Sequence, residues 1–435
     1  MISFIFSNPS HHLEMMAPVA RELTRRGQRT QLVSLAELRG FRTPAWPGAD
    51  ELLVHSNFGL AQGKLTHDAP MVRVMPALRS SPTVGTAGPA SEGTSTKRRW
   101  LQALLWNGGL RLRMRQLLHG SQVLVLPNDA VFPYQEIIAQ ASRHQIPWVV
   151  LQEGIRFPFP NGYRGSKYGS SGAARLCVWG QGSAEHFLQQ GIAPVALAVT
   201  GNPRFDQFSV EDWRTRGAAL QTTLGLASKP LALLTNPIEL QGFCDLSRKY
   251  ALVEELLHAA VPLCAARDIP LVIKNHLQED AGYYQALVAR VGAAHPGAVI
   301  KLITDAALFA VVAMARAAVV MASTAGLEAL LLGVPLVVVE LPPHGFAFEY
   351  VARGAAVGVR SSSEYRTKDI DALLAAAAVA PTPAATAFVE RHLAGVLHAS
   401  AAAQVADVTM AVRNEFLRST AGARSVSTAS GEHES

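Results

Sequence analysis

Cysteine and charge are both scarce in this sequence. Its 435 residues include three cysteines that lie far apart and form no CxxC pair, Cys177, Cys244 and Cys264. This spacing argues against a disulfide framework or a structural zinc site and favours reduced packing residues. Charged residues make up 17% of the chain and hydrophobic residues 49%, so the composition is that of a globular protein.

Signals for secretion and for membrane insertion are also lacking. The N-terminal run MISFIF has no basic segment and is interrupted by Asn8 and Pro9. The longest apolar tract, at 306–322, contains Arg316 and divides better into a helix and a strand than into a membrane span. We therefore expect a cytoplasmic protein, and a position at the cytoplasmic face of the inner membrane stays open.

Length and net charge narrow the class of protein. A chain of 435 residues is long for one compact domain and predicts two domains of about 200 residues each. The formal net charge of +6 favours an anionic partner. Nucleotide phosphates, a lipid-linked acceptor, an acidic membrane surface and nucleic acid all fit that charge, and the charge alone does not choose among them.

The first residues predict a parallel β-α-β unit. A strand at 2–6 is followed by a polar turn that contains His12, a helix at 13–26 and a second strand at 29–34. The turn follows the carboxyl end of the first strand, which is where open α/β sheets bind ligands. His12 is therefore a candidate site residue.

Polar residues follow two further strands in the first half of the chain. The predicted strand at 122–126 leads to Asp129, and the predicted strand at 148–151 leads to Glu153. A continuing series of such units predicts a doubly wound α/β domain.

The second half repeats this pattern after a looser segment. A predicted strand at 271–273 leads into Lys274 and His276, both on a polar loop. The predicted organisation is a first domain at 1–207 with a flexible insertion at 80–96, a linker at 208–229, a second domain at 230–384, a helix at 385–418 and a disordered tail at 419–435.

The segment at 97–118 is basic and contains tryptophans between leucines. Such a helix can lie on an anionic membrane face or contact a lipid-linked acceptor. The alternative is a solvated domain helix with its leucines in the core, and Gly108 and Gly109 favour that alternative because they interrupt a long helix.

The stretch at 318–340 predicts a strand, a turn, a helix and a second strand. Its turn consists of Ser323, Thr324, Ala325 and Gly326. The turn combines unpaired backbone N–H groups, two hydroxyl groups and a glycine, so an anion can approach the backbone closely. Glu328 and Glu340 add carboxylates, which suits a nucleotide phosphate with its ribose hydroxyls. The alternative is a helix cap that binds nothing.

These patterns together resemble the GT-B fold of nucleotide-sugar glycosyltransferases, specifically bacterial capsule and surface-polysaccharide enzymes, with kinship to UDP-GlcNAc 2-epimerases. The resemblance covers most of the chain. It is carried by HLEMMAPVARELTRRG from His12, VTGNPRFD from Val199 and STAGLEALLLGVPLVVVE from Ser323. It implies two Rossmann-like doubly wound α/β domains that face a cleft, with the acceptor on the first domain and the nucleotide-sugar on the second.

A narrower resemblance concerns transferases that use CMP-activated sialic acid or Kdo. These carry an acidic-acidic-Gly motif, a His-Pro motif and a Ser/Thr pair before a helix. This chain has Gln152-Glu153-Gly154, His276-Leu277 and Ser323-Thr324 in the same order. Gln152 replaces an acid and Leu277 replaces the proline, so CMP-sugars, UDP-sugars and CDP-polyols all stay open as donors.

The family resemblance implies sugar transfer, in which an acceptor hydroxyl attacks the anomeric carbon while nucleotide phosphate leaves. Glu153 or His12 is the expected base, with Asp129 as a third candidate. The expected donor-binding residues are Lys274 and His276 at the leaving group, Ser323, Thr324, Ala325 and Gly326 at the phosphate, and Glu328 and, less directly, Glu340 at the ribose. An inverting reaction is expected.

No metal and no cofactor are expected, since the sequence has no dense His/Asp cluster and the turn at Ser323 itself supplies a positive field. The expected partners are a nucleotide-sugar donor and an oligosaccharide or lipid-linked acceptor, without nucleic acid. A UDP-sugar 2-epimerase, a CDP-polyol phosphotransferase and a non-catalytic sugar-binding subunit are the alternatives. The epimerase is less favoured because the chain lacks the fuller set of acidic residues expected of that chemistry.

Overall fold

The computed structural model of the protein describes residues 1–8, 11–36, 49–55, 60–65, 71–74, 112, 114–156, 167–276, 278–360, 382–393 and 400–429. The predicted insertion at 80–96 and most of the basic segment at 97–118 lie outside these residues, so the structure does not bear on either prediction.

The chain folds into two compact units, each built on its own sheet. Unit 1 consists of Met1–Glu153, Ser166–Gln207 and Leu393–Ser435, and unit 2 consists of Gly154–Gly165 and Phe208–His392. Both sheets are largely parallel and carry helices between their strands, so the predicted class of two doubly wound α/β units is confirmed. Unit 1 also includes the C-terminal part of the chain, which the predicted first domain at 1–207 did not.

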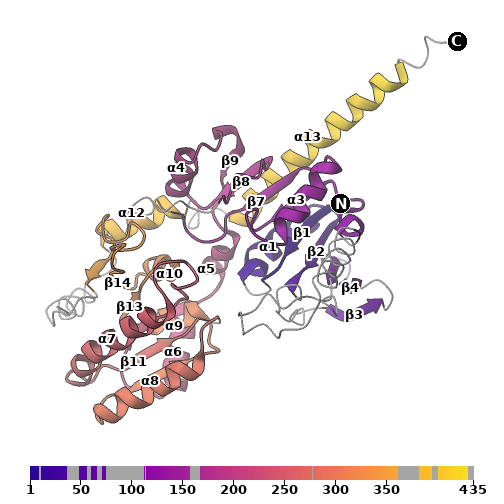
Figure 1. Cartoon of the computed structure of the whole chain (residues 1–435). Coiled ribbons are helices and arrows are strands. Elements are labelled where there is room, and N and C mark those ends of the chain that lie inside the picture. Colours follow the sequence, from indigo (N-terminus) through magenta and orange to yellow (C-terminus); the bar gives the residue numbers. More distant parts are fainter. Residues whose placement is uncertain are drawn as a thin grey trace, which may run out of the picture. The chain divides into compact units, whose positions relative to one another are not determined.

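The sheet of unit 1 has nine strands in the order β3-β4-β5-β2-β1-β6-β7-β8-β9. Central strand β1 pairs in parallel with β2 and with β6, and all five of its residues are buried because helices cover both faces (Figure 1). The elements are β1 (Ile2–Phe6), α1 (His11–Arg25), β2 (Thr30–Ser34), β3 (Ala49–His55), β4 (Leu60–Leu65), β5 (Met71–Val74), β6 (Val123–Leu126), α3 (Tyr134–Arg143), β7 (Trp148–Leu151), β8 (Arg175–Val178), α4 (Gln181–Gln189), η3 (Pro194–Ala196), β9 (Leu197–Val199), η4 (Pro203–Asp206), α5 (Gln207–Val210) at the boundary, and α13 (Ala401–Ala429).

Helix α1 follows directly from its sequence. Met16, Val19 and Leu23 recur at helical spacing and are all buried in the core of unit 1. The helix ends before Gly27, whose φ of +78° is the left-handed conformation that glycine adopts without steric cost. Two antiparallel pairs, β3 with β4 and β4 with β5, extend the sheet beyond β2 and were not predicted from the sequence.

Helix α13 is held on unit 1 by Asp206, the last residue of the stretch VTGNPRFD. The Asp206 carboxylate accepts the backbone N–H groups of Ala401 and Ala402 at 2.8 and 2.9 Å, as well as the Ser400 hydroxyl. Asp206 therefore caps the N-terminus of α13. Nearby, Arg204 forms an ion pair with Glu14 of α1 at 2.6 Å.

The C-terminal helices differ from the predicted single helix at 385–418. The chain instead forms α12 (Pro383–His392) in unit 2 and α13 in unit 1, with residues 394–399 outside the described part. Helix α13 continues through Ala429, into the segment at 419–435 that was predicted to be a disordered tail. Residues 419–429 contain no proline, so the backbone can continue the helix there.

The sheet of unit 2 has six parallel strands in the order β12-β11-β10-β13-β14-β15. The elements are α6 (Trp213–Thr223), β10 (Leu231–Leu234), α7 (Leu246–Ala265), β11 (Leu271–Lys274), α8 (Ala281–Ala294), β12 (Ile300–Ile303), α9 (Leu308–Met314), β13 (Ala317–Val320), α10 (Ala325–Leu331), β14 (Leu336–Val339), β15 (Val357–Val359) and α12. Helix α6 falls inside the predicted linker at 208–229.

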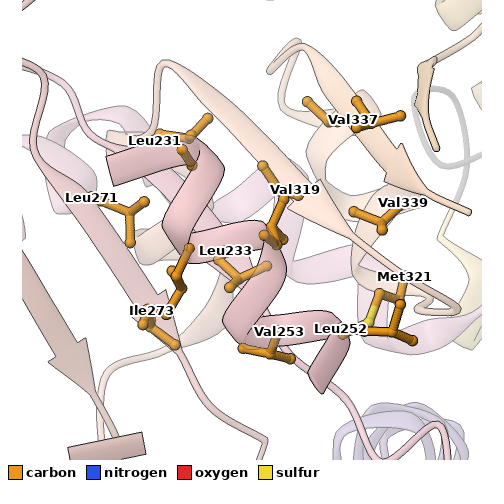
Figure 2. Packing of buried hydrophobic residues seen from close by; sticks show 14 of the residues in the cluster. Leu231, Leu233, Leu252, Val253, Leu271, Ile273, Val319, Met321, Val337 and Val339 are labelled. Carbon is orange, nitrogen blue, oxygen red and sulfur yellow. The ribbon is translucent and has the colours of Figure 1, made fainter. Parts of the chain in front are cut away.

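The core of unit 2 forms between α7 and the sheet. Figure 2 shows Leu252 and Val253 of α7 close to side chains from four strands, among them Leu233, Ile273 and Val319. The strand sequences LALL, LVIK, AAVV and LVVV are apolar nearly throughout, as expected where both faces of a parallel sheet are covered. This core leaves the polar residues at the carboxyl ends of the strands to form the site.

Candidate functional site

Each sheet has a point where the chain reverses its direction of winding. In unit 1 the winding runs from β1 to β2 and then resumes on the other side of β1 at β6, and in unit 2 β13 likewise lies on the opposite side of β10 from β11. Open α/β sheets bind ligands at the carboxyl ends of the strands beside such a point. The predicted site residues of each unit follow these strands or their neighbours.

In unit 1 the structure brings His12 and Glu153 into contact. His12 lies in the first turn of α1 after β1, and Glu153 follows β7. The Nε2 atom of His12 lies 3.0 Å from Oε1 of Glu153, although the residues are far apart in sequence. The amide of Asn128, which follows β6, donates to Oε2 of Glu153 at 2.9 Å. Three neighbouring strand ends thus converge on one carboxylate.

The hydrogen bonds of His12 fix which ring nitrogen carries the proton. Nδ1 lies 3.3 Å from the backbone nitrogen of Ser7 and 3.1 Å from that of Asn8. Backbone N–H groups only donate, so Nδ1 accepts and a neutral ring carries its proton on Nε2. That proton points at Glu153. His12 is therefore a donor to the carboxylate, and both ring nitrogens are engaged.

Glu153 is the more accessible member of the pair. Its side chain is 29% exposed, whereas that of His12 is 4% exposed. Burial favours the neutral acid, but the hydrogen bond from His12, the charges that His12 and His11 carry when protonated at acid pH, and the hydrogen bond from Asn128 outweigh it and lower the pKa of Glu153 from 4.5 to about 2. Glu153 is accordingly an ionised, partly exposed carboxylate at neutral pH.

Two tyrosines complete the surroundings of this pair. The hydroxyl of Tyr134 lies 3.0 Å from Oγ of Ser7 and 3.2 Å from Nδ1 of His12. The hydroxyl of Tyr168 accepts the backbone N–H of Glu153 at 2.8 Å and lies 2.8 Å from the carbonyl oxygen of Leu151. These contacts hold both the backbone and the side chains of the pair.

Asp129, the third candidate base, has a different arrangement from Glu153. Its two carboxylate oxygens accept the backbone N–H groups of Gly169 and Ser171 at 2.8 and 3.1 Å, and the residue is 4% exposed. It anchors a loop. Its neighbour Asn128 is the residue that reaches Glu153, and the sequence carried the same signal for it, a polar side chain directly after a buried strand.

Gln152 supports the same strand end from inside. Its Oε1 accepts the backbone N–H of Trp179 at 3.0 Å, and its Nε2 donates to Ser183 at 2.8 Å. Its carbonyl oxygen accepts the indole N–H of Trp179 at 2.7 Å. Gln152 is 1% exposed, so it packs inside unit 1 and Glu153 alone faces outward.

In unit 2, His276 lies on a tight turn after β11. The N–H of Glu279 donates to the carbonyl oxygen of His276 at 3.0 Å, and the N–H of His276 donates to the Glu279 carboxylate at 2.8 Å. Nδ1 of His276 accepts the N–H of Gln278 at 3.2 Å. Although the residue is exposed overall, the protein around the ring desolvates it, which lowers the pKa of His276 and outweighs the raising effect of Glu279. The ring is therefore neutral at pH 7, and because Nδ1 accepts, its proton is on Nε2.

Lys274 lies at the end of β11 and is half-buried. Its ammonium donates to the carbonyl oxygens of Thr304 at 2.7 Å and Asn275 at 3.3 Å. Burial lowers its pKa, and Asp305 opposes that shift. Lys274 therefore supplies a positive charge at the same strand ends as His276.

The turn from Ser323 to Gly326 begins α10 as predicted. Ser323 and Thr324 are half-buried, and Oγ of Ser323 accepts the backbone N–H of Ala325 at 3.2 Å. The reason for Gly326 is packing: a Cβ atom there would lie 2.9 Å from Cζ of Tyr350. The absent side chain makes room for a tyrosine, whereas the sequence suggested room for an anion.

The two carboxylates near this turn differ in exposure. Glu328 is 1% exposed and buried with Tyr350, whose pKa is raised by burial and by the charge of Glu328. Glu340 is half-buried after β14, and its N–H donates to the carbonyl oxygen of Val359 at 2.8 Å. Of the two, Glu340 is the more accessible to a ligand.

Among the described residues, no group of three or more His, Cys, Asp or Glu side chains is arranged to hold a metal ion. Within the same part of the chain, no helix is both long enough and apolar enough to cross a membrane.

The fold that these two sheets define is that of UDP-GlcNAc 2-epimerase structures. The enzyme from Neisseria meningitidis, bound to UDP-GlcNAc, gives a TM-score of 0.57 at 12% identity, covering 94% of this chain and 99% of that chain. The enzyme from Methanocaldococcus jannaschii gives 0.56 at 13% identity with the same coverage. Anabaena Alr3699/HepE in complex with UDP and glucose gives 0.50 at 14% identity, covering 94% and 98%. At these identities the likeness establishes the fold.

A family of proteins described as capsule polysaccharide biosynthesis proteins matches the chain over residues 236–348. This segment lies within unit 2 and contains Lys274, His276 and the turn at Ser323. No curated protein sequence matches the chain.

Proposed function

We propose that the protein is a glycosyltransferase that moves a sugar from a nucleotide-sugar donor to a surface-polysaccharide or glycolipid acceptor. The observation that carries the proposal is the Glu153 carboxylate, ionised and partly exposed at the winding reversal of unit 1. The match of residues 236–348 to capsule polysaccharide biosynthesis proteins supports the class of product. Two of the similar structures hold UDP-GlcNAc or UDP and glucose, which supports a nucleotide-sugar as the donor.

In this proposal Glu153 accepts the proton of the acceptor hydroxyl as that oxygen attacks the anomeric carbon. The bond from the anomeric carbon to the nucleotide phosphate breaks, and its electrons leave with the phosphate. His12 does not take the proton, because Nε2 already donates to Glu153 and Nδ1 accepts two backbone N–H groups. Its role is to orient the carboxylate and keep it ionised.

The leaving phosphate is assigned to unit 2. The Nε2–H of His276 and the ammonium of Lys274 supply donors for a phosphate oxygen, and the Ser323 and Thr324 hydroxyls supply two more. Glu340 is assigned to the ribose in preference to Glu328, because Glu328 is 1% exposed. The proposed step includes no metal, because the Lys274 ammonium and the backbone N–H groups at the Ser323 turn are assigned to the charge of the leaving phosphate.

The test combines binding with turnover. Calorimetric titration with CMP, UDP and CDP identifies the nucleobase, and free nucleotide is then measured with the matching nucleotide-sugar, with and without lipid-linked oligosaccharide acceptors. We expect nucleotide release that depends on the acceptor and that His276→Gln lowers. Glu255→Gln, an exposed glutamate on α7, is the control and should behave as the wild type.

A 2-epimerase is the second candidate, favoured by the likeness of the fold to epimerases over 94% of the chain. An epimerase would convert UDP-GlcNAc without any acceptor, so one NMR spectrum of the incubated donor separates the two functions. Appearance of the C2 epimer in the absence of acceptor would overturn the transferase proposal.

A further inference from the structure

Beneath the turn that carries His276 lies a buried cluster of charged side chains. Lys249 of α7 is 1% exposed, and its ammonium lies 2.6 Å from Oε1 of Glu279 and 2.9 Å from Oε2 of Glu239. The Glu279 side chain is also 1% exposed. One buried cation thus pairs with the buried carboxylate of Glu279 and with that of Glu239, which is 15% exposed.

The Glu279 carboxylate is bound from three separate elements. Oε1 accepts the Lys249 ammonium from α7 and the Tyr284 hydroxyl from α8, the latter at 2.9 Å. Oε2 accepts the hydroxyl of Thr235, which follows β10, together with the N–H of His276 at 2.8 Å. Each oxygen therefore has two donors, so the carboxylate has little freedom to move.

His276 takes its orientation from this fixed carboxylate. The turn is closed in both directions, because Glu279 accepts the N–H of His276 and donates its own N–H to the carbonyl oxygen of His276. Within the turn, the N–H of Gln278 is bound by Nδ1 of the ring. Because Nδ1 accepts this N–H, Nε2 is the protonated nitrogen of the neutral ring, on an exposed residue.

We propose that Glu279, held by Lys249, Thr235 and Tyr284, is the positioning residue that fixes the rotamer and tautomer of His276 for a phosphate oxygen of the donor. This rests on the function proposed above. A buried ion pair is seldom more stabilising than apolar side chains of the same size, and its best-attested benefit is a defined geometry. Here the geometry is that of a single donor, Nε2–H.

The test uses Thr235, where an almost isosteric change removes one donor to Glu279. Thr235→Val deletes the hydroxyl, and Thr235→Ser restores it. Tyr284→Phe removes a second donor, with Tyr283→Phe as the matched control, since the Tyr283 hydroxyl donates to the carbonyl oxygen of Tyr250 instead. Thermal unfolding of each variant establishes that it is folded.

The first readout is the ¹⁵N spectrum of the His276 ring without any ligand, assigned by the signals lost in His276→Gln. We expect a single Nε2–H tautomer in the wild type. Thr235→Val and Tyr284→Phe should shift the signals toward the average of a solvated imidazole, and Thr235→Ser should reverse most of that shift. Wild-type ring signals in folded Thr235→Val and Tyr284→Phe would overturn the proposal.

The second readout is kcat/KM for the donor. Losing one hydrogen bond to a buried carboxylate corresponds to about a 10- to 100-fold loss, which Thr235→Val should show and Thr235→Ser should largely recover. The transferase function and the positioning role of Glu279 can be overturned independently of each other. If the wild type transfers no sugar but the ring signals change as expected, the positioning role stands and the transferase function is overturned.

Discussion

The two sheets place a histidine and a glutamate at comparable strand ends but exchange their roles. In unit 1 the carboxylate of Glu153 is 29% exposed and His12 supports it from the interior. In unit 2 His276 is exposed, and the carboxylate of Glu279, 1% exposed, supports it from the interior. In the function proposed above, the side chain that faces outward has the chemical role: it accepts a proton in unit 1 and donates a hydrogen bond to phosphate in unit 2.

The difference follows from what surrounds each carboxylate. Glu153 is held by an imidazole, a side-chain amide and the backbone, all of which leave part of it accessible. Glu279 is held by an ammonium and two hydroxyls that enclose it. The identity of the acidic residue therefore says less about its role than the charge and number of its donors.

The strongest test of this comparison exchanges the outward carboxylate for an amide. Glu153→Gln should lower kcat by about 10²- to 10⁴-fold, because the amide cannot accept the acceptor proton. Nucleotide binding to unit 2, measured by calorimetry, should be unchanged. A Glu153→Gln variant with wild-type kcat would show that the base lies elsewhere.

Next in size is the loss of the buried cation of unit 2. Lys249→Met leaves Glu279 and Glu239 without compensation and should lower the free energy of unfolding by about 3–5 kcal/mol. Arg248, the residue before Lys249 on α7, forms an exposed ion pair with Glu255. Arg248→Met should change the free energy of unfolding by about 1 kcal/mol or less. Urea unfolding measures both, and equal effects would contradict the distinction between a buried and an exposed pair.

The third prediction concerns the stability of the folded protein at acid pH. Because the pKa of Glu153 is lowered from 4.5 to about 2, its ionised form stabilises the folded state above pH 4.5, and this stabilisation is lost as the pH falls from 4.5 toward 2. That shift corresponds to at most about 3 kcal/mol. Glu153→Gln should therefore unfold with a shallower pH dependence in this window, as followed by circular dichroism. An unchanged acid transition would show that the carboxylate is not held as described.

The smallest expected effect is on the cap of α13. Asp206→Ala should destabilise unit 1 by about 1–2 kcal/mol, since two backbone N–H groups lose their acceptor. Hydrogen exchange should report faster opening of α13 alone. Asp212→Ala removes the cap of α6 in unit 2, where Asp212 accepts the backbone N–H and the hydroxyl of Thr215, and it should leave the exchange of α13 unchanged. Equal protection of α13 in Asp206→Ala and the wild type would contradict the capping role.

Much of the fold was predictable because the hydrophobic pattern and the turn residues of each strand or helix are visible in its local sequence. The strands predicted at 2–6 and 148–151 coincide with β1 and β7, and the helix that Gly27 ends is α1. The strands β3 to β5 escaped prediction: a sequence such as LAQGKL has no continuous apolar run or clear alternation. The packing of α13 on unit 1 was not predicted either, because it depends on a contact with Asp206, almost 200 residues earlier in the chain.

The candidate site was only partly predictable. Residues directly after strands, among them His12, Glu153 and His276, could be selected because parallel strands end at a common edge. Asn128 carried the same signal but was passed over for charged Asp129. The sequence also contained a signal that Lys249 is buried, because Lys249 lies at helical spacing from Leu252 and Leu256 on the apolar face of α7. Only its carboxylate partners, remote in sequence, account for a buried lysine there.

The sequence by itself determined the class of fold and the set of polar residues at the strand ends, because hydrophobic periodicity and turn chemistry act over a few residues. Which histidine is buried and which is exposed was decided by tertiary structure. So were the pairing of His12 with Glu153, 141 residues away, and the enclosure of Glu279 by donors from several elements. Hydrogen-bond partners at that separation are set by packing, which no local pattern encodes.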